Sequence, residues 1–239
     1  MKKLLFIMAF TFFNFILFSE PSQEIPAIDF NQYLNFKPMY TWSNIRIWGW
    51  SRDSKIAYSN DKYIDGRGGV ITTVAIFDLI NDVIIWEKML DSFNYEEEEN
   101  EIIYSDAYNN FIIDFRKTCE QNRIEFMQTK FLNLPIRFNK QTVNIIIESN
   151  KKSDVREEWE SDFYGDIGNY KTIAENQGIK KIIHEKTFST AAVDVVVCGY
   201  FISPFEDRAL IVIGEYVRVF EGWDIEYVFI GCHLSVGFR

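Results

Sequence analysis

The chain has 239 residues, of which 47% are hydrophobic and 17% aromatic, and this length suffices for one domain with a full hydrophobic core. The formal charge of −10 repels phosphate groups, which argues against nucleic acid as a partner and against docking on anionic lipid. Three cysteines and two histidines are too few for a disulfide framework or for most zinc sites, so we expect no cofactor.

The N-terminus has the layout of a secretory signal. Residues 1–3 are basic, and residues 4–18 form an almost unbroken apolar run that is shorter than the roughly 20 residues of a membrane-spanning helix. Ser19 suits the position before a cleavage site, whereas Leu17 fits the preference for small residues poorly. We therefore expect a signal peptide over residues 1–19, export to the periplasm or the extracellular space, and no stable membrane span after cleavage. The alternative is an uncleaved N-terminal anchor.

Residues 20–40 are polar and aromatic and contain three prolines, so we interpret them as a tether. The remainder, residues 41–239, is predicted to form a single β-rich domain. At its start, residues 44–88 predict four short strands, because β-branched and aromatic runs alternate with turn residues. The turns fall at residues 51–54, at the glycine-rich residues 65–69 and at residues 81–82.

The first of these turns lies in a longer motif, WSRDSKIAY at residues 50–58. It resembles the aromatic-Ser-Pro-Asp-Gly-Lys-Ile-Ala-Tyr motif of TolB-type β-propeller repeats, with Arg52 in place of the usual proline and Ser54 in place of the glycine. Residues 201–210 contain a weaker echo. The resemblance implies blade-like antiparallel sheet and a binding role, and the motif carries no catalytic residues. The rest of the chain is too short for a complete propeller, which needs at least about four blades of about 40 residues.

The best helix signal covers residues 105–121. Ser105 is suited to cap this helix, and Asp106 suits its first turn. We interpret Cys119 as a packing residue, because it completes the apolar stripe of the helix. The stripe consists of residues four apart in the sequence: Ile103, Ala107, Phe111, Phe115 and Cys119.

The C-terminal part is predicted as strands. Residues 142–148 predict one strand, and residues 150–178 are expected to hold one irregular hairpin and a loop. Three long strands follow at residues 193–203, 208–220 and 224–235. Short links between them predict an antiparallel meander, and apolar side chains on both faces predict a sheet covered on both sides.

This meander also predicts the state of two cysteines. Cys198 and Cys232 fall on its outer two strands, so their backbones should lie about 9–10 Å apart. A disulfide requires Cα atoms closer than about 7 Å. We therefore expect both cysteines to be reduced and buried.

Three residues are binding candidates. Asp65 and Arg67 lie in the glycine-rich loop, although no Lys-Ser/Thr pair follows and a tight turn is the simpler interpretation. His233 is the third candidate, and a structural role is the simpler interpretation for it as well. Cys232 precedes it but points to the opposite face of the strand, so these two neighbours cannot form a dyad.

Two acidic segments contain the carboxylates that a metal site would need. Residues 96–99 are four consecutive glutamates, which we interpret as a solvated loop because adjacent glutamates do not preorganise a site. Asp162, Asp166 and Asn169 lack the alternating oxygen pattern and the closing glutamate of an EF-hand loop. No catalytic or metal-binding residue is assigned from the sequence.

These observations predict a β-dominated α+β fold, in which blade-like N-terminal hairpins and a C-terminal three-stranded meander pack together and the helix covers one face. The expected function is that of an exported, non-enzymatic binding or interaction module for a protein or a small ligand. The alternatives are a carboxylate-dependent, glycosidase-like hydrolase and a structural envelope protein. A groove that holds two converging acids would favour the hydrolase, and an exposed apolar patch would favour the interaction module.

Overall fold

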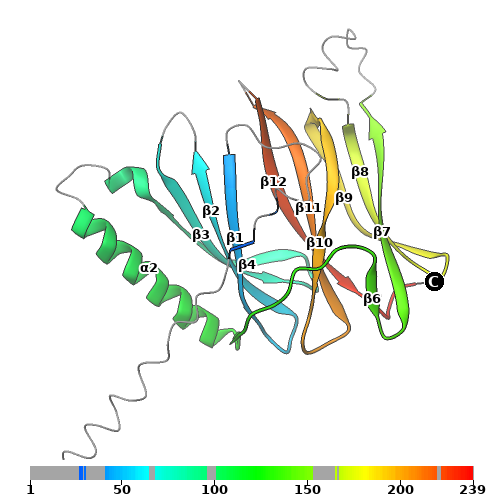
Figure 1. Ribbon diagram of the computed structural model, residues 1–239, viewed down its shortest axis with the longest axis horizontal. Helices are drawn as coiled ribbons and strands as arrows, with labels where there is room; N and C mark the ends of the chain where they lie inside the picture. Colours follow the sequence, from blue (N-terminus) through cyan, green and yellow to red (C-terminus); the bar gives the residue numbers. More distant parts are fainter. Residues whose placement is uncertain are drawn as a thin grey trace, which may run out of the picture.

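The computed structural model describes residues 27–28, 30, 41–64, 68–95, 101–152, 165, 167–219 and 222–238. These residues form three antiparallel sheets and one long helix, as predicted for a β-dominated α+β fold. Figure 1 shows the helix at one end of the molecule and the sheets following it in layers. Among the helices that the structure describes, none is both long and apolar enough to cross a membrane.

The helix-side sheet has the strand order β4-β3-β2-β1-β5. Its first four strands form a meander, as the turn signals predicted, and β5 pairs with the end of β1. The strands are β1 (Thr41–Trp50), β2 (Lys55–Ile64), β3 (Val70–Asp78), β4 (Val83–Asp91) and the short β5 (Glu125–Phe126).

The central sheet is the predicted C-terminal meander, with the order β10-β11-β12. It consists of β10 (Asp194–Ile202), β11 (Arg208–Val219) and β12 (Gly222–His233). Both of its faces are buried, as predicted. Leu210 and Val212 pack toward the helix-side sheet, while Ile211 and Ile213 on the same strand pack toward the third sheet. Successive side chains of β11 point to opposite faces of the sheet, so neighbouring residues of this strand belong to two different hydrophobic cores.

The far sheet has the order β6-β7-β8-β9 and covers the other face of the central sheet. The expected strand at 142–148 belongs to it as part of β7. Residues 150–178, where an irregular hairpin was expected, instead contain the strand β8, which pairs with β7 and β9, and β6 and the 14-residue β9 were not predicted. The strands are β6 (Ile136–Phe138), β7 (Gln141–Lys151), β8 (Ile167–Asn176) and β9 (Ile179–Ala192).

The long helix α2 (Glu101–Gln121) follows the 3-10 turn η2 (Ser92–Tyr95) and begins four residues before the predicted start. Ser105 and Asp106 are therefore exposed residues inside the helix, and Ser105 is not its cap. Of the predicted apolar stripe, the part from Phe111 to Cys119 is confirmed, Ala107 is half-buried, and the side chain of Ile103 lies outside the described residues. Phe111, Phe115 and Cys119 are buried against the outer face of the helix-side sheet.

The two WSRDSKIAY-like turns lie next to each other, because their sheets pack face to face. The Ser54 hydroxyl donates a hydrogen bond to Glu206, and the Arg52 guanidinium lies 4.7 Å from the ring centre of Phe205. Both turns begin at a buried serine, Ser51 or Ser203, whose backbone N–H bonds across the turn. The two sequence echoes are thus spatial neighbours, while the relation to propeller repeats stays a prediction.

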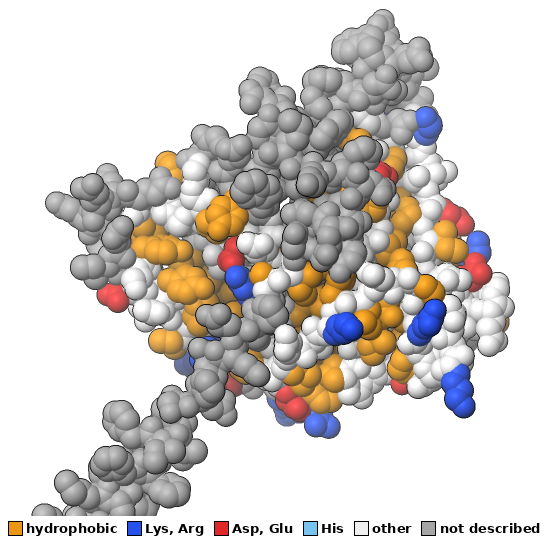
Figure 2. Space-filling model, viewed as in Figure 1, with side chains coloured by type: hydrophobic (Ala, Val, Ile, Leu, Met, Phe, Trp, Pro, Cys, Tyr) orange, Lys and Arg blue, Asp and Glu red, His pale blue; other side chains and the backbone are white. Residues whose placement is uncertain are grey.

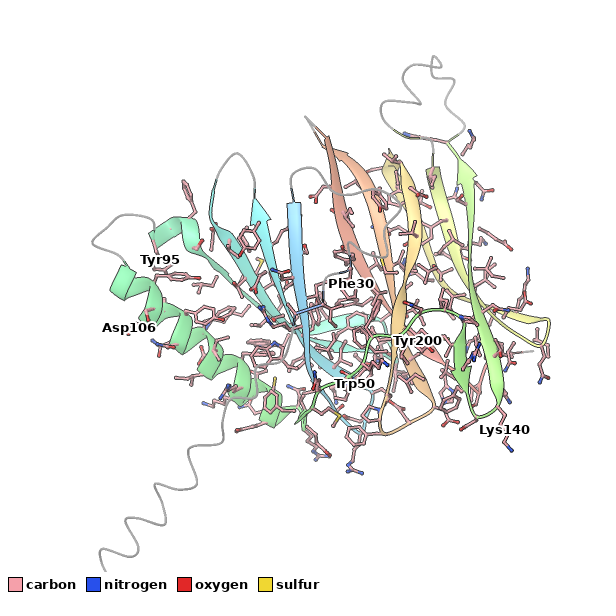
Figure 3. The ribbon with its side chains drawn as sticks, viewed as in Figure 1. Phe30, Trp50, Tyr95, Asp106, Lys140 and Tyr200 are labelled. Atoms are coloured by element: carbon pink, nitrogen blue, oxygen red, sulfur yellow. The ribbon has the colours of Figure 1, made fainter. Side chains whose placement is uncertain are left out.

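Part of the expected tether contacts the domain. Ile28 pairs with Ile45 of β1, and Phe30 is fully buried between the helix-side and central sheets. The centre of the Phe30 ring lies 4.9 Å from the ring centre of Phe131 and 5.1 Å from that of Tyr227. Figure 3 shows Phe30 at this position. This segment therefore joins the domain before residue 40.

Cys198 and Cys232 are both free and buried, as predicted. They lie on β10 and β12, and β11 separates them. Burial raises the pKa of the Cys198 thiol to about 12, so this thiol stays protonated and unreactive near neutral pH.

Candidate functional site

Two of the three predicted binding residues, Asp65 and Arg67, lie outside the described residues. The same holds for the acidic run at 96–99 and for Asp162 and Asp166. Asn169 is described, and its side chain accepts a hydrogen bond from Asn150 at 2.9 Å. Within the described part of the chain, no group of three or more metal-ligating side chains comes together.

His233, the third predicted binding residue, lies at the end of β12 opposite Arg208. Its Nδ1 accepts a hydrogen bond from the backbone N–H of Ser235 at 3.2 Å. Partial burial lowers its pKa, and the positive charges of Arg208 and Lys181 lower it further. Lys181 of β9 donates to the backbone carbonyls of His233 and Val236, so this region attaches the C-terminal segment to the far sheet.

Asp82 connects the helix-side sheet to the central sheet near Arg208, the residue opposite His233. It lies in the turn between β3 and β4 and accepts a hydrogen bond from the backbone N–H of Gly231 in β12 at 2.6 Å. Burial raises the pKa of Asp82 to about 6, although the bond from Gly231 and the charge of Arg208 oppose this shift. The folded protein therefore binds a proton at Asp82 more tightly than the unfolded chain does.

Replacing Asp82 with asparagine is expected to change how stability depends on pH. The contribution of the protonated carboxyl is fully present below about pH 4 and is lost as pH rises through about 6. Asp82→Asn should therefore gain about 1–2 kcal/mol relative to the wild type between about pH 4 and pH 7, since partial exposure reduces the full effect. Urea unfolding at both pH values measures this difference.

Asp78→Asn is the control, because Asp78 occupies the same turn and has the opposite shift. Burial raises the pKa of Asp78 less than hydrogen bonds from the Asn81 side chain and from the backbone of Ile80 and Asn81 together lower it. Its substitution should cost more stability at the higher pH. Equal slopes for both variants would contradict the assignment of Asp82.

A buried polar cluster lies between the central and far sheets. Glu215 of β11 is fully buried, and its carboxylate accepts a hydrogen bond from the Tyr170 hydroxyl at 2.5 Å. Its second oxygen accepts from Lys186 Nζ, and the Lys186 side chain is one-third exposed. His184 lies beside Tyr170, with 5.6 Å between the two ring centres. This constellation comes from three strands and was not predicted from the sequence.

One exposed apolar feature is the edge strand β4. Only β3 pairs with it among the described strands, so one edge of the nine-residue β4 has no strand partner there. Ile84, Ile85 and Met89 are 46%, 42% and 64% exposed. Ile84 and Met89 lie opposite Phe77 and Thr73, which places them on the face turned toward the central sheet, yet that sheet leaves them uncovered.

The other face of β4 is anchored to the helix. The Trp86 ring stacks on Phe115 at 6.1 Å, and Lys88 pairs with Asp114 of α2 at 2.6 Å. These contacts fix the strand while its outer edge stays exposed. A fixed edge with exposed apolar side chains is a ready template for pairing with another strand.

A row of aromatic rings continues from the end of β4, and we call it the tyrosine row. Tyr95 of η2 lies 5.5 Å from Tyr104, Tyr104 lies 6.2 Å from Tyr108, and Tyr108 lies 6.3 Å from Phe111, all between ring centres. Figure 3 shows Tyr95 beside the first turns of α2, and Figure 2 shows apolar side chains at the surface in this part of the molecule. Tyrosine offers a large contact area at a low entropic cost and is enriched in interfaces.

The opposite edge strand, β9, differs in character. Its sequence carries four charged residues, which are Lys180, Lys181, Glu185 and Lys186. Charged side chains, lysine above all, protect sheet edges from unwanted pairing. β4 has one lysine, Lys88, whereas β9 has three, so the two edge strands differ in the residue type that protects an edge best.

A surface cavity of about 370 Å³ is lined by Arg137, Phe138, Asn139, Lys140, Gln141 and Thr142. All six belong to the hairpin of β6 and β7, and none is an acid. The cavity therefore does not supply the pair of carboxylates that a glycosidase-like hydrolase requires.

Comparisons with known proteins give no relative from which a site could be transferred. The sequence matches no family model, and neither the curated proteins nor the solved structures give a match. The candidate site therefore rests on the geometry of β4 and the tyrosine row.

Proposed function

We propose that the chain is an exported, non-enzymatic binding module that captures an extended polypeptide segment by strand addition to β4. The observation that carries this proposal is the exposed outer edge of β4, with Ile84, Ile85 and Met89 exposed along it. In strand addition, backbone hydrogen bonds supply affinity, and alternate side chains of the added strand supply specificity.

The tyrosine row extends this surface beyond the end of the strand. Tyr108 is 38% exposed, and Tyr95 and Tyr104 are half-buried, so the three rings offer a preorganised aromatic surface. A partner strand that runs along β4 would bring its next residues against these rings. Aromatic anchors of this kind carry much of the energy of protein interfaces.

Charge defines the partner further. The chain has a formal charge of −10, and the four glutamates at 96–99 follow Tyr95 directly in the sequence. A partner with an apolar core and flanking Lys or Arg residues matches this environment. Export is part of the proposal because residues 1–19 have the layout of a signal peptide.

The test is selection of displayed random peptides of about nine residues, the length of β4, on the wild-type protein. Enriched peptides should have alternating apolar residues, basic flanks and no proline. The double variant Ile84→Lys/Met89→Lys should bind them at least about tenfold more weakly, because it places a charge on two of the exposed apolar residues of β4, including Met89, which is 64% exposed.

The matched control is Ile179→Lys/Ile182→Lys, which adds the same two charges to the other exposed edge. Ile179 and Ile182 are 43% and 53% exposed on β9. This variant should bind the peptides like the wild type. Equal loss in both variants, equal binding by all three proteins, or no enrichment above an unrelated acidic protein would each contradict the proposal. Concentration-dependent self-association that is lost in Ile84→Lys/Met89→Lys would instead identify a second copy as the partner.

A further inference from the structure

The cluster around Glu215 contains two polar atoms that are buried without a hydrogen-bond partner among the described residues. They are Oγ1 of Thr172 and Nε2 of His184. The two residues are directly opposite each other on β8 and β9, so their side chains share the face turned toward Glu215. Tyr170 and Lys186, the two donors to Glu215, form the next pair on the same face.

The charges of the cluster balance only while His184 is neutral. Glu215 is the one charged residue that is fully buried in the part of the chain that the structure describes. Lys186 compensates it when His184 is neutral. The neighbouring carboxylate, Glu226, lies opposite Glu215 on β12 but is exposed to solvent. A proton taken up by His184 therefore places two cations beside one buried carboxylate.

The two cations differ in their access to water. The Lys186 side chain is one-third exposed and can extend its ammonium group into solvent. Nε2 of His184 is buried, and a charge on it needs a nearby anion. When both compete for Glu215, the histidine has no alternative partner among the described residues, whereas the lysine has solvent.

We propose that this cluster is an acid-sensitive junction between the central and far sheets, in which protonation of His184 transfers Glu215 from Lys186 to His184 and releases the lysine to solvent. The groups facing His184 are Tyr170 and Thr172 of β8, Lys186 of β9 and Glu215 of β11. Burial lowers the pKa of His184, Glu215 raises it and Lys186 lowers it, so the transition lies below the usual histidine range. This inference does not depend on the proposed strand addition.

The test uses amine acetylation of the full chain, followed by mass spectrometry, between about pH 7.5 and pH 5. The rate at Lys186 is divided by the rate at Lys171, an exposed lysine on the same sheet whose partner is Glu185. This ratio should rise about threefold as pH falls, because the protonated fraction of His184 sets the fraction of released Lys186. In His184→Gln, which stays neutral, the ratio should stay constant.

A second measurement applies to the wild-type protein alone. The ¹⁵N shifts of the His184 ring and of Lys186 Nζ should change with one common midpoint. The proposal is overturned if the ratio rises equally in His184→Gln, if His184 titrates while Lys186 does not respond, or if the two shifts have different midpoints. It is also overturned if His184 stays neutral throughout this range.

Discussion

Replacing Gly231 with alanine is expected to destabilise the fold by about 3 kcal/mol, because an added methyl group cannot be accommodated there. A Cβ at this position would lie 1.9 Å from the carbonyl oxygen of Leu79. Leu79 cannot easily move. Its carbonyl accepts a hydrogen bond from Arg208 at 3.2 Å, and its N–H donates to Ser54 at 2.9 Å. Equilibrium unfolding in urea measures the loss.

Gly178→Ala is the control for this substitution. Gly178 has a φ of +82° and no heavy atom within 4 Å of an added Cβ, so its substitution tests backbone strain without a clash. It should cost about 1 kcal/mol. A loss at Gly231 no larger than at Gly178 would show that β12 does not approach the turn at Leu79 as closely as described.

Replacing Lys186 with methionine is expected to cost about 2–3 kcal/mol at neutral pH. Methionine keeps the apolar stem but leaves the fully buried Glu215 without its cation. Breaking a buried ion pair from one side leaves an uncompensated charge, whereas removing both charges leaves none. Glu215→Gln should therefore cost only about 1 kcal/mol, because Lys186 still reaches solvent, and the double variant should be more stable than Lys186→Met.

Lys171→Met supplies the matched surface control. Lys171 pairs with Glu185 at 3.0 Å, and both side chains are exposed. Its loss should change the free energy of unfolding by less than about 0.5 kcal/mol. The account of the cluster is contradicted if the two lysine variants lose equal stability, or if the double variant is no more stable than Lys186→Met.

The elements predicted best from the sequence are those with a regular pattern. The spacing of Phe111, Phe115 and Cys119 predicts the helix, because a period near four places them on one face. The three C-terminal strands are equally clear, since β-branched runs alternate with short links. The N-terminal end of the helix was misplaced because Ser105 has the type of a cap residue, although the chain is already helical from Glu101.

The far sheet was harder to predict because its edge strand β9 is mostly polar. β9 carries four charged residues and is an edge strand, so it lacks the alternation of a half-buried strand. The run 83–86 has the opposite problem. Its apolar sequence is typical of a buried strand, but most of these residues are exposed at the edge of the sheet. Burial of short apolar runs depends on neighbouring sheets, which local sequence does not specify.

One feature of the sequence indicates the Glu215 cluster. Glu215 is a single acid inside a strand whose two faces were predicted to be covered, and a buried carboxylate requires partners. Its partners could not be identified in the same way. Tyr170 and Lys186 are 45 and 29 residues distant along the chain, and only the packing of β8 and β9 on β11 brings them together.

Amide hydrogen exchange in the presence of a selected peptide tests the proposed strand addition most directly. On addition of the peptide, the amides of β4 (Val83–Asp91) that point away from β3 should gain protection, because they become hydrogen-bonded to the peptide, whereas the alternate amides that already face β3 should change less. The amides of β9 should exchange as before. Gained protection on β9 or β12 with none on β4, or peptide binding without any change in exchange, would contradict the assignment of β4 as the binding edge.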